Sequence, residues 1–215
     1  MKKFIVLVLL IVFAGALPII GQVVSEEEVV ELLNGHILQL DNQTNKNLSF
    51  VRQVGSKNSA VSIQEQGGIV PNLVMVNQDG IANTGYIEHS GSELTTHLWQ
   101  YNIGNEANLW LVGKNILTSV KQDGERNVVN SYIENDGVNK RSATFLQEGN
   151  YNRIDFSLRA SHPMEQVAII NQYGNQHQVE AHMEPSSAPV TIDQYGAEGM
   201  KVNVSTSAFN FPMKR

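Results

Sequence analysis

The 215-residue sequence contains no cysteine, only six prolines, and few aromatic residues, which make up 7% of the chain. Without cysteine, neither disulfide bonds nor thiolate metal sites can hold the fold together. Charged residues are also scarce, at 17%, and acidic residues outnumber basic ones by 21 to 15. This balance argues against a nucleic-acid partner, because phosphates favour a basic surface. Cohesion must therefore come from backbone pairing and from packing.

Long hydrophobic runs are missing as well, except at the start of the chain. Two lysines precede an apolar run over 4–13, and small residues follow it, which is the layout of a secretory signal peptide. We therefore predict a cleaved signal peptide at 1–21 and a secreted protein with no stable membrane span. A membrane-spanning helix fits worse, because it needs about 20 apolar residues and Gly15 and Pro18 interrupt this run. Several cleavage positions over 16–22 fit the segment.

What the sequence has instead is one short polar motif, Gln-x-Gly-x-x-Asn, repeated along most of the chain. The glutamines that open the motif recur at intervals of 25, 22, 22, 25, 25 and 22 residues. They are Gln53, Gln78, Gln100, Gln122, Gln147, Gln172 and Gln194. Such regular recurrence is typical of repeat proteins, in which each repeat stacks on its neighbours.

Two more columns of the repeat are equally regular. Two positions after the glutamines stand Gly55, Gly80, Asn102, Gly124, Gly149, Gly174 and Gly196. Glycine and asparagine tolerate a positive φ best, so this column predicts a tight turn. Five positions after the glutamines stand Asn58, Asn83, Asn105, Asn127 and Asn152, followed by His177 and Gly199 in the last two copies.

Apolar residues alternate with polar ones on both sides of the turn. Two positions before the glutamines stand Val51, Val76, Leu98, Val120, Phe145, Ile170 and Ile192. After the turn the alternation resumes at Ala60, Gly85, Ala107, Val129, Ile154 and Val179. A period of two predicts a strand with one buried face, so each unit is strand, turn, strand. In the last unit the alternation slips by one residue, which a bulge at Gly199 would correct.

One such unit cannot fold alone, because four or five apolar side chains do not offset the entropy cost of ordering about 22 residues. Stacked units pair each strand with its counterpart about 4.8 Å away and align the Gln and Asn columns as ladders of amide hydrogen bonds. We therefore predict an all-β fold, a β-solenoid of seven stacked strand-turn-strand repeats over 48–206. Unpaired strand edges at its two ends would recruit further chains, so we also expect cross-β, amyloid-like assembly.

This pattern resembles the curlin repeats of bacterial curli fibre subunits, in which Gln-x-Gly-x-x-Asn is followed two residues later by Ala or Val. The resemblance covers about 48–205 and implies a subunit of extracellular, pilus-like functional amyloid fibres that support biofilm matrix, cell adhesion and surface colonisation. As partners it implies further copies of the chain, other curlin-like subunits, and a curli-type secretion and nucleation machinery.

The sequence also departs from the family pattern. The serine that usually opens each unit is missing, and the usual second glutamine occurs only as Gln64. The sequence leaves open whether the chain is the major fibre subunit or a minor, nucleating subunit anchored at the cell surface.

Charged residues interrupt the position directly after the glutamine, which is expected to face outward. Asp79, Asp123 and Glu148 occupy it in three units, and like charges one repeat apart weaken pairing. We expect these residues to act as gatekeepers that slow premature aggregation. Tyr101, Tyr173 and Tyr195 fill the same position in three other units, where they either stack along the sheet or offer an aromatic stripe to a polysaccharide.

Two further segments flank the repeats. Residues 22–47 fit either a short helix, with a capping box at Ser25 and Glu28, or a disordered segment. Residues 207–215 end in two basic residues and fit a cap, a surface anchor or a disordered tail.

No pattern in the sequence points to catalysis. The six histidines are scattered, and the sequence has neither a phosphate-binding loop nor a nucleophile elbow. We interpret His177 as a substitute for the ladder asparagine, since both side chains can donate and accept hydrogen bonds. We predict no enzyme and no catalytic, cofactor-binding or metal-binding residues. A monomeric β-solenoid adhesin with capped ends is the alternative to a fibre subunit.

Overall fold

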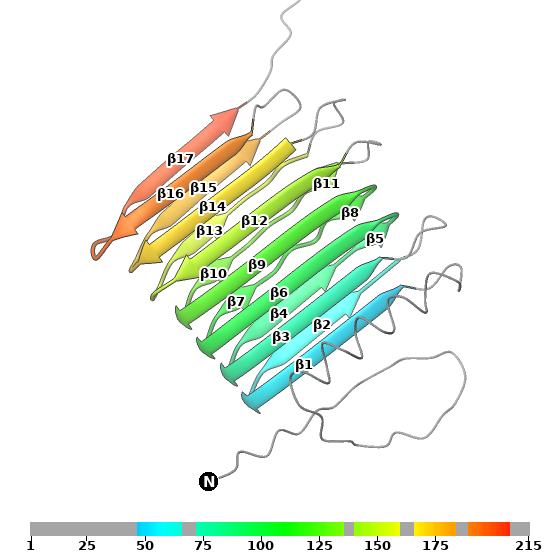
Figure 1. Ribbon diagram of the computed structural model, residues 1–215, viewed down its shortest axis with the longest axis horizontal. Helices are drawn as coiled ribbons and strands as arrows, with labels where there is room; N and C mark the ends of the chain where they lie inside the picture. Colours follow the sequence, from blue (N-terminus) through cyan, green and yellow to red (C-terminus); the bar gives the residue numbers. More distant parts are fainter. Residues whose placement is uncertain (1–46, 66–71, 136–139, 160–165, 184–188, 207–215) are drawn as a thin grey trace, which may run out of the picture.

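A computed structural model describes residues 47–65, 72–135, 140–159, 166–183 and 189–206. Within these ranges the regular structure consists of strands only, and their parallel pairing forms a β-solenoid of about six turns (Figure 1). The predicted all-β solenoid is therefore confirmed. The signal peptide predicted at 1–21, nearly all of the segment 22–47 and the tail at 207–215 lie outside the described residues.

The strands that precede the tight turns form a seven-stranded parallel sheet, here the first sheet. Its strands in spatial order are β1 (Leu48–Ser56), β3 (Leu73–Ile81), β6 (Leu94–Ile103), β9 (Ile116–Glu125), β12 (Arg141–Glu148), β14 (Gln166–Gly174) and β16 (Val190–Gly196). Spatial order follows chain order, and every ladder glutamine pairs with the next one, as Gln53 does with Gln78. The 22- and 25-residue spacings are therefore in-register spacings.

The strands that follow the turns form a second seven-stranded parallel sheet, which lies behind the first in Figure 1. Its strands are β2 (Ser59–Ile63), β4 (Thr84–Glu88), β7 (Glu106–Ala107), β10 (Val128–Val129), β13 (Arg153–Asp155), β15 (Gln178–Met183) and β17 (Lys201–Thr206). We call a first-sheet strand together with the second-sheet strand that follows it a rung, so β1–β2 is the first rung and β16–β17 the last.

A third, small sheet lies on the path back from the second sheet to the first. It contains β5 (Ser90–Gly91), β8 (Val112–Gly113) and β11 (Glu134–Asn135). The interval from glutamine to asparagine is always five residues, so the three extra residues of the longer repeats fall on this return path. In the first six rungs the turn edge of the solenoid thus has a fixed length, whereas the return edge varies.

Inward side chains of the two large sheets meet in one hydrophobic core. Between the end rungs, the apolar positions before and after each turn are buried. Phe145 of β12 meets Phe156, which follows β13, edge to face with ring centroids 5.1 Å apart. In the end rungs the core is only partly covered: Val51, Val202 and Val204 are half-buried and pack against it.

The last rung carries one extra residue between its two strands. Gly174 pairs with Gly196, 22 residues on, but Gln178 pairs with Lys201, 23 residues on. This shift returns the apolar alternation of β17 to the core, as the predicted correction of register required. It also moves the position that corresponds to the asparagine column of the earlier rungs by one residue.

The N–H of Arg153 donates to the carbonyl of His177 in the next rung, and in the same way the N–H of Gln178 donates to the carbonyl of Met200 in the last rung. Met200 therefore occupies the slot that sequence spacing assigned to Gly199, and that assignment was wrong by one residue. The described residues contain no helix that is long and apolar enough to cross a membrane.

His89 is buried at a core position that leucine and isoleucine fill in the next two rungs, at Leu111 and Ile133. Its side chain is 1% exposed, and neither ring nitrogen has a hydrogen-bond partner in the described part of the chain. Burial lowers the pKa of His89 from 6.5 to about 4. The solenoid thus contains a neutral histidine that resists protonation.

This burial predicts a loss of stability in acid that a leucine at position 89 removes. Between pH 6.5 and 4 the unfolded chain binds the proton and the folded chain does not, so the free energy of unfolding falls as the pH falls. At pH 5 the loss is about 2 kcal/mol. We expect His89→Leu to flatten this pH dependence and to stabilise the fold more at pH 5 than at pH 7, in urea unfolding followed by circular dichroism. A pH dependence unchanged by His89→Leu would show that another group is responsible.

Candidate functional site

The glutamines of the first sheet form a continuous ladder of hydrogen bonds through the core. From Gln53 to Gln172, each Nε2 donates to the Oε1 of the glutamine one rung further, at 2.6–2.9 Å. Each interior Nε2 also donates to a second-sheet carbonyl of the rung before, as Gln122 does to Glu106 at 2.9 Å. Both amide protons are used, so these fully buried side chains avoid the cost of an unpaired polar group.

The asparagines form a second ladder at the turn edge. Nδ2 of Asn127 donates to the carbonyl of Gly149 in the next rung at 2.7 Å, and its Oδ1 accepts the backbone N–H of Asn152 at 3.0 Å. Donation to the next rung's turn carbonyl also occurs at Asn58, Asn83, Asn105 and Asn152. These side chains tie the turn of each rung to the rung that follows.

His177 continues this ladder in the rung β14–β15. It is fully buried, and its backbone N–H donates to Oδ1 of Asn152 at 2.9 Å. Its Nε2 lies 3.1 Å from the carbonyl of Gly196, where it donates, and its Nδ1 accepts the N–H of Met200 at 3.2 Å. The ring therefore makes the contacts of an asparagine, and they require the neutral tautomer with the proton on Nε2.

The turn column combines positive φ with very close stacking. All seven residues from Gly55 to Gly196, Asn102 included, have φ between 73° and 154°. A Cβ built on Gly149 would lie 2.0 Å from the carbonyl oxygen of Gly174 in the next rung. Asn102 is the one residue of this column that carries a side chain. Its Nδ2 donates to a carboxylate oxygen of Asp123 at 2.8 Å.

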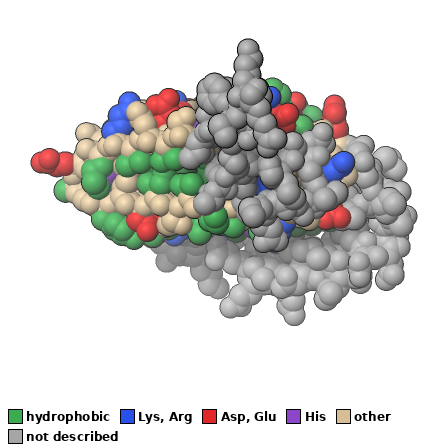
Figure 2. All heavy atoms as spheres, turned by 90° about the horizontal axis from the view of Figure 1, so that it is seen from above, with side chains coloured by type: hydrophobic (Ala, Val, Ile, Leu, Met, Phe, Trp, Pro, Cys, Tyr) green, Lys and Arg blue, Asp and Glu red, His purple; other side chains and the backbone are tan. Residues whose placement is uncertain are grey.

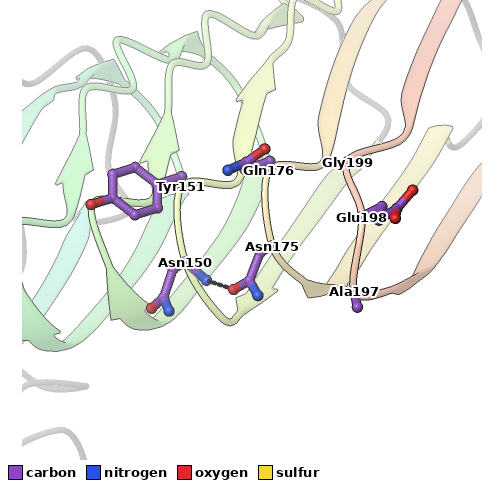
Figure 3. Close-up of a pocket in the computed structure, with 7 residues that line it drawn as sticks. All are labelled: Asn150, Tyr151, Asn175, Gln176, Ala197, Glu198 and Gly199. Atoms are coloured by element: carbon purple, nitrogen blue, oxygen red, sulfur yellow. Dashed lines mark hydrogen bonds between the residues drawn. The ribbon is translucent and has the colours of Figure 1, made fainter.

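Sequence reasoning missed two further features of the turn. The residue before the ladder position has a left-handed backbone, with φ of 52–67°, at Lys57, Ala82, Gly104, Arg126, Tyr151 and Gln176. These side chains differ so much that no residue type marks the column. Next to them, Oδ1 of Asn150 accepts the N–H of Glu125 at 2.8 Å and Oδ1 of Asn175 accepts the N–H of Asn150 at 2.9 Å (Figure 3).

The outer turn of the last three rungs encloses a shallow, open hollow (Figure 3). Asn150 and Asn175 line it together with Tyr151, Gln176 and the residues 197–199. In the last rung, Ala197 fills the position of Asn150 and Asn175. The hydrogen bonds that these two asparagine side chains make therefore do not continue into that rung. Both asparagines directly follow a turn glycine, which is the sequence signal that could have identified them.

The predicted gatekeepers lie on the outward face of the first sheet. Asp123 and Glu148 are register neighbours, as expected for like charges one rung apart. Lys121 offsets them, because its Nζ lies 3.1 Å from Oε1 of Glu148, and this contact raises the pKa of Lys121. Asp79 is paired with Tyr101 and has no acidic register neighbour on that side.

Aromatic side chains gather at two places on the surface. Tyr173 and Tyr195 stack with parallel rings 4.8 Å apart, whereas Asp123 and Glu148 separate them from Tyr101. On the path from the second sheet to the third, Trp110 contacts Tyr132 with ring centroids 4.8 Å apart, and Trp110 is half exposed. The three tyrosines of the first sheet therefore do not form one stripe.

The histidines are not brought together as ligands. His177 faces the core and His182 is exposed, while His36 and His162 lie outside the described residues. In the ranges that the structure describes, no three His, Cys, Asp or Glu side chains are placed to hold a metal ion.

Within the described residues, the two ladders begin in the first rung and end in the last. Among the described strands, β1 and β2 have neighbours on one side only, and so do β16 and β17. Figure 2 shows hydrophobic side chains in rows on the described part of the face seen from above, with charged side chains along its margins. Edges of this kind, with a partly covered core, can pair with further strands.

Searches of protein-family models, of curated proteins and of solved structures found no match to this chain.

Proposed function

We propose that this chain is a structural subunit of extracellular, curli-like amyloid fibres. The observation that carries the proposal is the in-register stacking of identical turns, with Gln and Asn ladders that run unbroken through the interior rungs. Each interior rung offers the next one the same backbone groups, ladder side chains and apolar columns. A further chain that pairs with an end rung therefore extends a pattern that the solenoid already contains.

The proposal includes a biological setting that follows from the resemblance to curlin repeats. The chain is exported, assembles at the bacterial cell surface, and supports biofilm matrix, adhesion and colonisation. Its partners are further copies, other curlin-like subunits, and a secretion and nucleation machinery of the curli type. Its role is structural, without catalysis.

Seeded assembly tests the proposal. The purified chain is diluted out of denaturant and followed by dye fluorescence, with fibre diffraction of the product. We expect a lag that preformed fibres abolish, and reflections near 4.7 and 10 Å. A chain that stays monomeric at all concentrations, with strand-rich circular dichroism, would contradict the fibre function.

Removing the outward acids is expected to speed assembly. Asp79→Asn, Asp123→Asn and Glu148→Asn together keep the side-chain size or nearly so and remove three negative charges, so the lag should shorten. The variant Lys121→Gln is the matched control, because it leaves Glu148 without its cation and should lengthen the lag. A lag that neither variant changes would rule out a gatekeeper role for this column.

A monomeric adhesin is the second candidate, and the Trp110–Tyr132 pair favours it. Such an aromatic pair, with Trp110 half exposed, can stack on a sugar ring, and the Tyr132 hydroxyl donates to Glu134 at 2.7 Å beside it. The Trp110→Ala variant distinguishes the two functions: it should abolish binding to an immobilised polysaccharide if the chain is an adhesin, and leave seeded assembly unchanged if it is a fibre subunit.

A further inference from the structure

The last rung differs from the others at the slot that asparagine or histidine fills before it. The backbone of Met200 lies in that slot, since its N–H donates to Nδ1 of His177 and its carbonyl accepts the N–H of Gln178 at 2.7 Å. The side chain of Met200 is 38% exposed. Its thioether has no proton to donate and is a weak acceptor.

Two hydrogen bonds therefore end at this rung. At an interior junction, the ladder asparagine donates to the turn carbonyl of the next rung and accepts the backbone N–H of the next ladder residue, as Asn127 does with Gly149 and Asn152. Met200 can make neither bond. The glutamine ladder also ends here. Nε2 of Gln194 donates to the carbonyl of Met200 in its own rung, at 2.9 Å.

The apolar columns, in contrast, continue into the same rung and are only partly covered there. Ile192 is buried, at 8% exposed, whereas Val202 and Val204 are half-buried at the margin of the core. The rung that matches this surface is the first rung of a second copy. Its β1 strand would place Val51 over Ile192 and Gln53 over Gln194, since both pairs have the same spacing along their strands.

The lack of an amide at Met200 would directly affect the contact with such a second copy. Its Gly55 and Asn58 would take the places that Gly149 and Asn152 have beside Asn127. The Gly55 carbonyl would then find no donor at the slot, and the Asn58 N–H would face the thioether of Met200. Burial of the apolar columns would still favour the contact, but without the two bonds that every interior asparagine supplies.

We propose that Met200 is a ladder stop, which makes the joint between β16–β17 of one copy and β1–β2 of the next the weakest contact in the stack. This inference rests on the proposed fibre function and deepens it, because it names a second copy as the partner and one residue that limits the strength of the joint. Assembly then leaves more soluble chain than it would with a complete ladder.

The test is to complete the ladder at position 200. Met200→Asn supplies both missing groups and should lower the concentration of soluble chain left at the end of assembly by about tenfold or more, since two hydrogen bonds are gained. Met200→His, which repeats the residue type found at His177, should act in the same direction and serves if the asparagine variant folds poorly. Met200→Leu keeps an apolar side chain of similar size and should leave the soluble concentration unchanged.

The outcomes separate the inference from the function on which it rests. Fibres from the natural chain, Met200→Asn and Met200→His that leave equal soluble concentrations would overturn the ladder stop and leave the fibre function standing. A drop seen equally with Met200→Leu would also overturn it, because the amide would then not be the cause. If none of the chains assembles, the fibre function itself is overturned, and the inference with it.

Discussion

Replacing Gln122 with leucine should lower the free energy of unfolding by about 4 kcal/mol, although leucine is similar in size and more hydrophobic. Gln122 accepts from Gln100 at 2.8 Å and donates to Gln147 at 2.9 Å. The substitution leaves a donor of Gln100 and an acceptor of Gln147 buried without a partner, and each such group costs about 1–3 kcal/mol. The hydrophobic gain of leucine at this fully buried position offsets only part of that cost.

The end of the same ladder provides the control. Gln53 is half-buried and shares a ladder bond with Gln78 alone, at 2.6 Å. Gln53→Leu leaves one buried group, Oε1 of Gln78, without its partner and should therefore cost about 2 kcal/mol, half of the loss expected at Gln122. The measurement is urea unfolding of freshly diluted, unassembled chain, followed by circular dichroism. Equal losses for the two variants would mean that position along the ladder does not matter, and that the chain of amides is not what stabilises the interior rungs.

A second large effect is expected at the turn, where Gly149→Ala should also destabilise the fold by about 4 kcal/mol. The added Cβ would lie 2.0 Å from the carbonyl oxygen of Gly174, so adjacent rungs would have to move apart. Overpacking of this kind costs about 1–3 kcal/mol. The backbone at φ +119° adds strain of about 1–3 kcal/mol for any residue with a side chain.

Gly196→Ala separates the two contributions. Its φ is also positive, at +154°, but no rung follows it in the described chain and the nearest atom to its Cβ is Cε of Met200 at 3.7 Å. This variant should lose about 2 kcal/mol, through strain alone. If Gly149→Ala were no more harmful than Gly196→Ala in the same urea experiment, close stacking of the turns would not be the reason for glycine in this column.

Much of the fold could be predicted because stacking converts sequence spacing into position. A residue that recurs every 22 or 25 positions must lie above its counterpart, so the glutamine column and the alternating apolar columns define both large sheets. The strands β5, β8 and β11 could not be predicted, since two residues are too few to show a period.

The candidate site was harder to predict at positions whose structure depends on backbone contacts and not on the type of side chain. The alternation of apolar residues indicated an extra residue in the last turn, but it did not say on which side of Gly199 this residue lies. The bond from the Gln178 N–H to the Met200 carbonyl identifies Met200 as the ladder residue. The left-handed column that includes Ala82 and Arg126 has no common chemistry. Its φ values are imposed by the pairing of each turn with the next, as in the bond from the Ala82 N–H to the Ser56 carbonyl.

The turn edge, which has the same length in the first six rungs, and the variable return edge make this solenoid a one-sided scaffold for display. A foreign peptide inserted at the turn would separate Gln from Asn and break both ladders, whereas the return path already accommodates three additional residues in some rungs. Peptides grafted at the return edge would emerge on one side only, in rows whose vertical spacing is the strand spacing of about 4.8 Å. Fibres built from such chains would carry enzymes or epitopes in single file along one face.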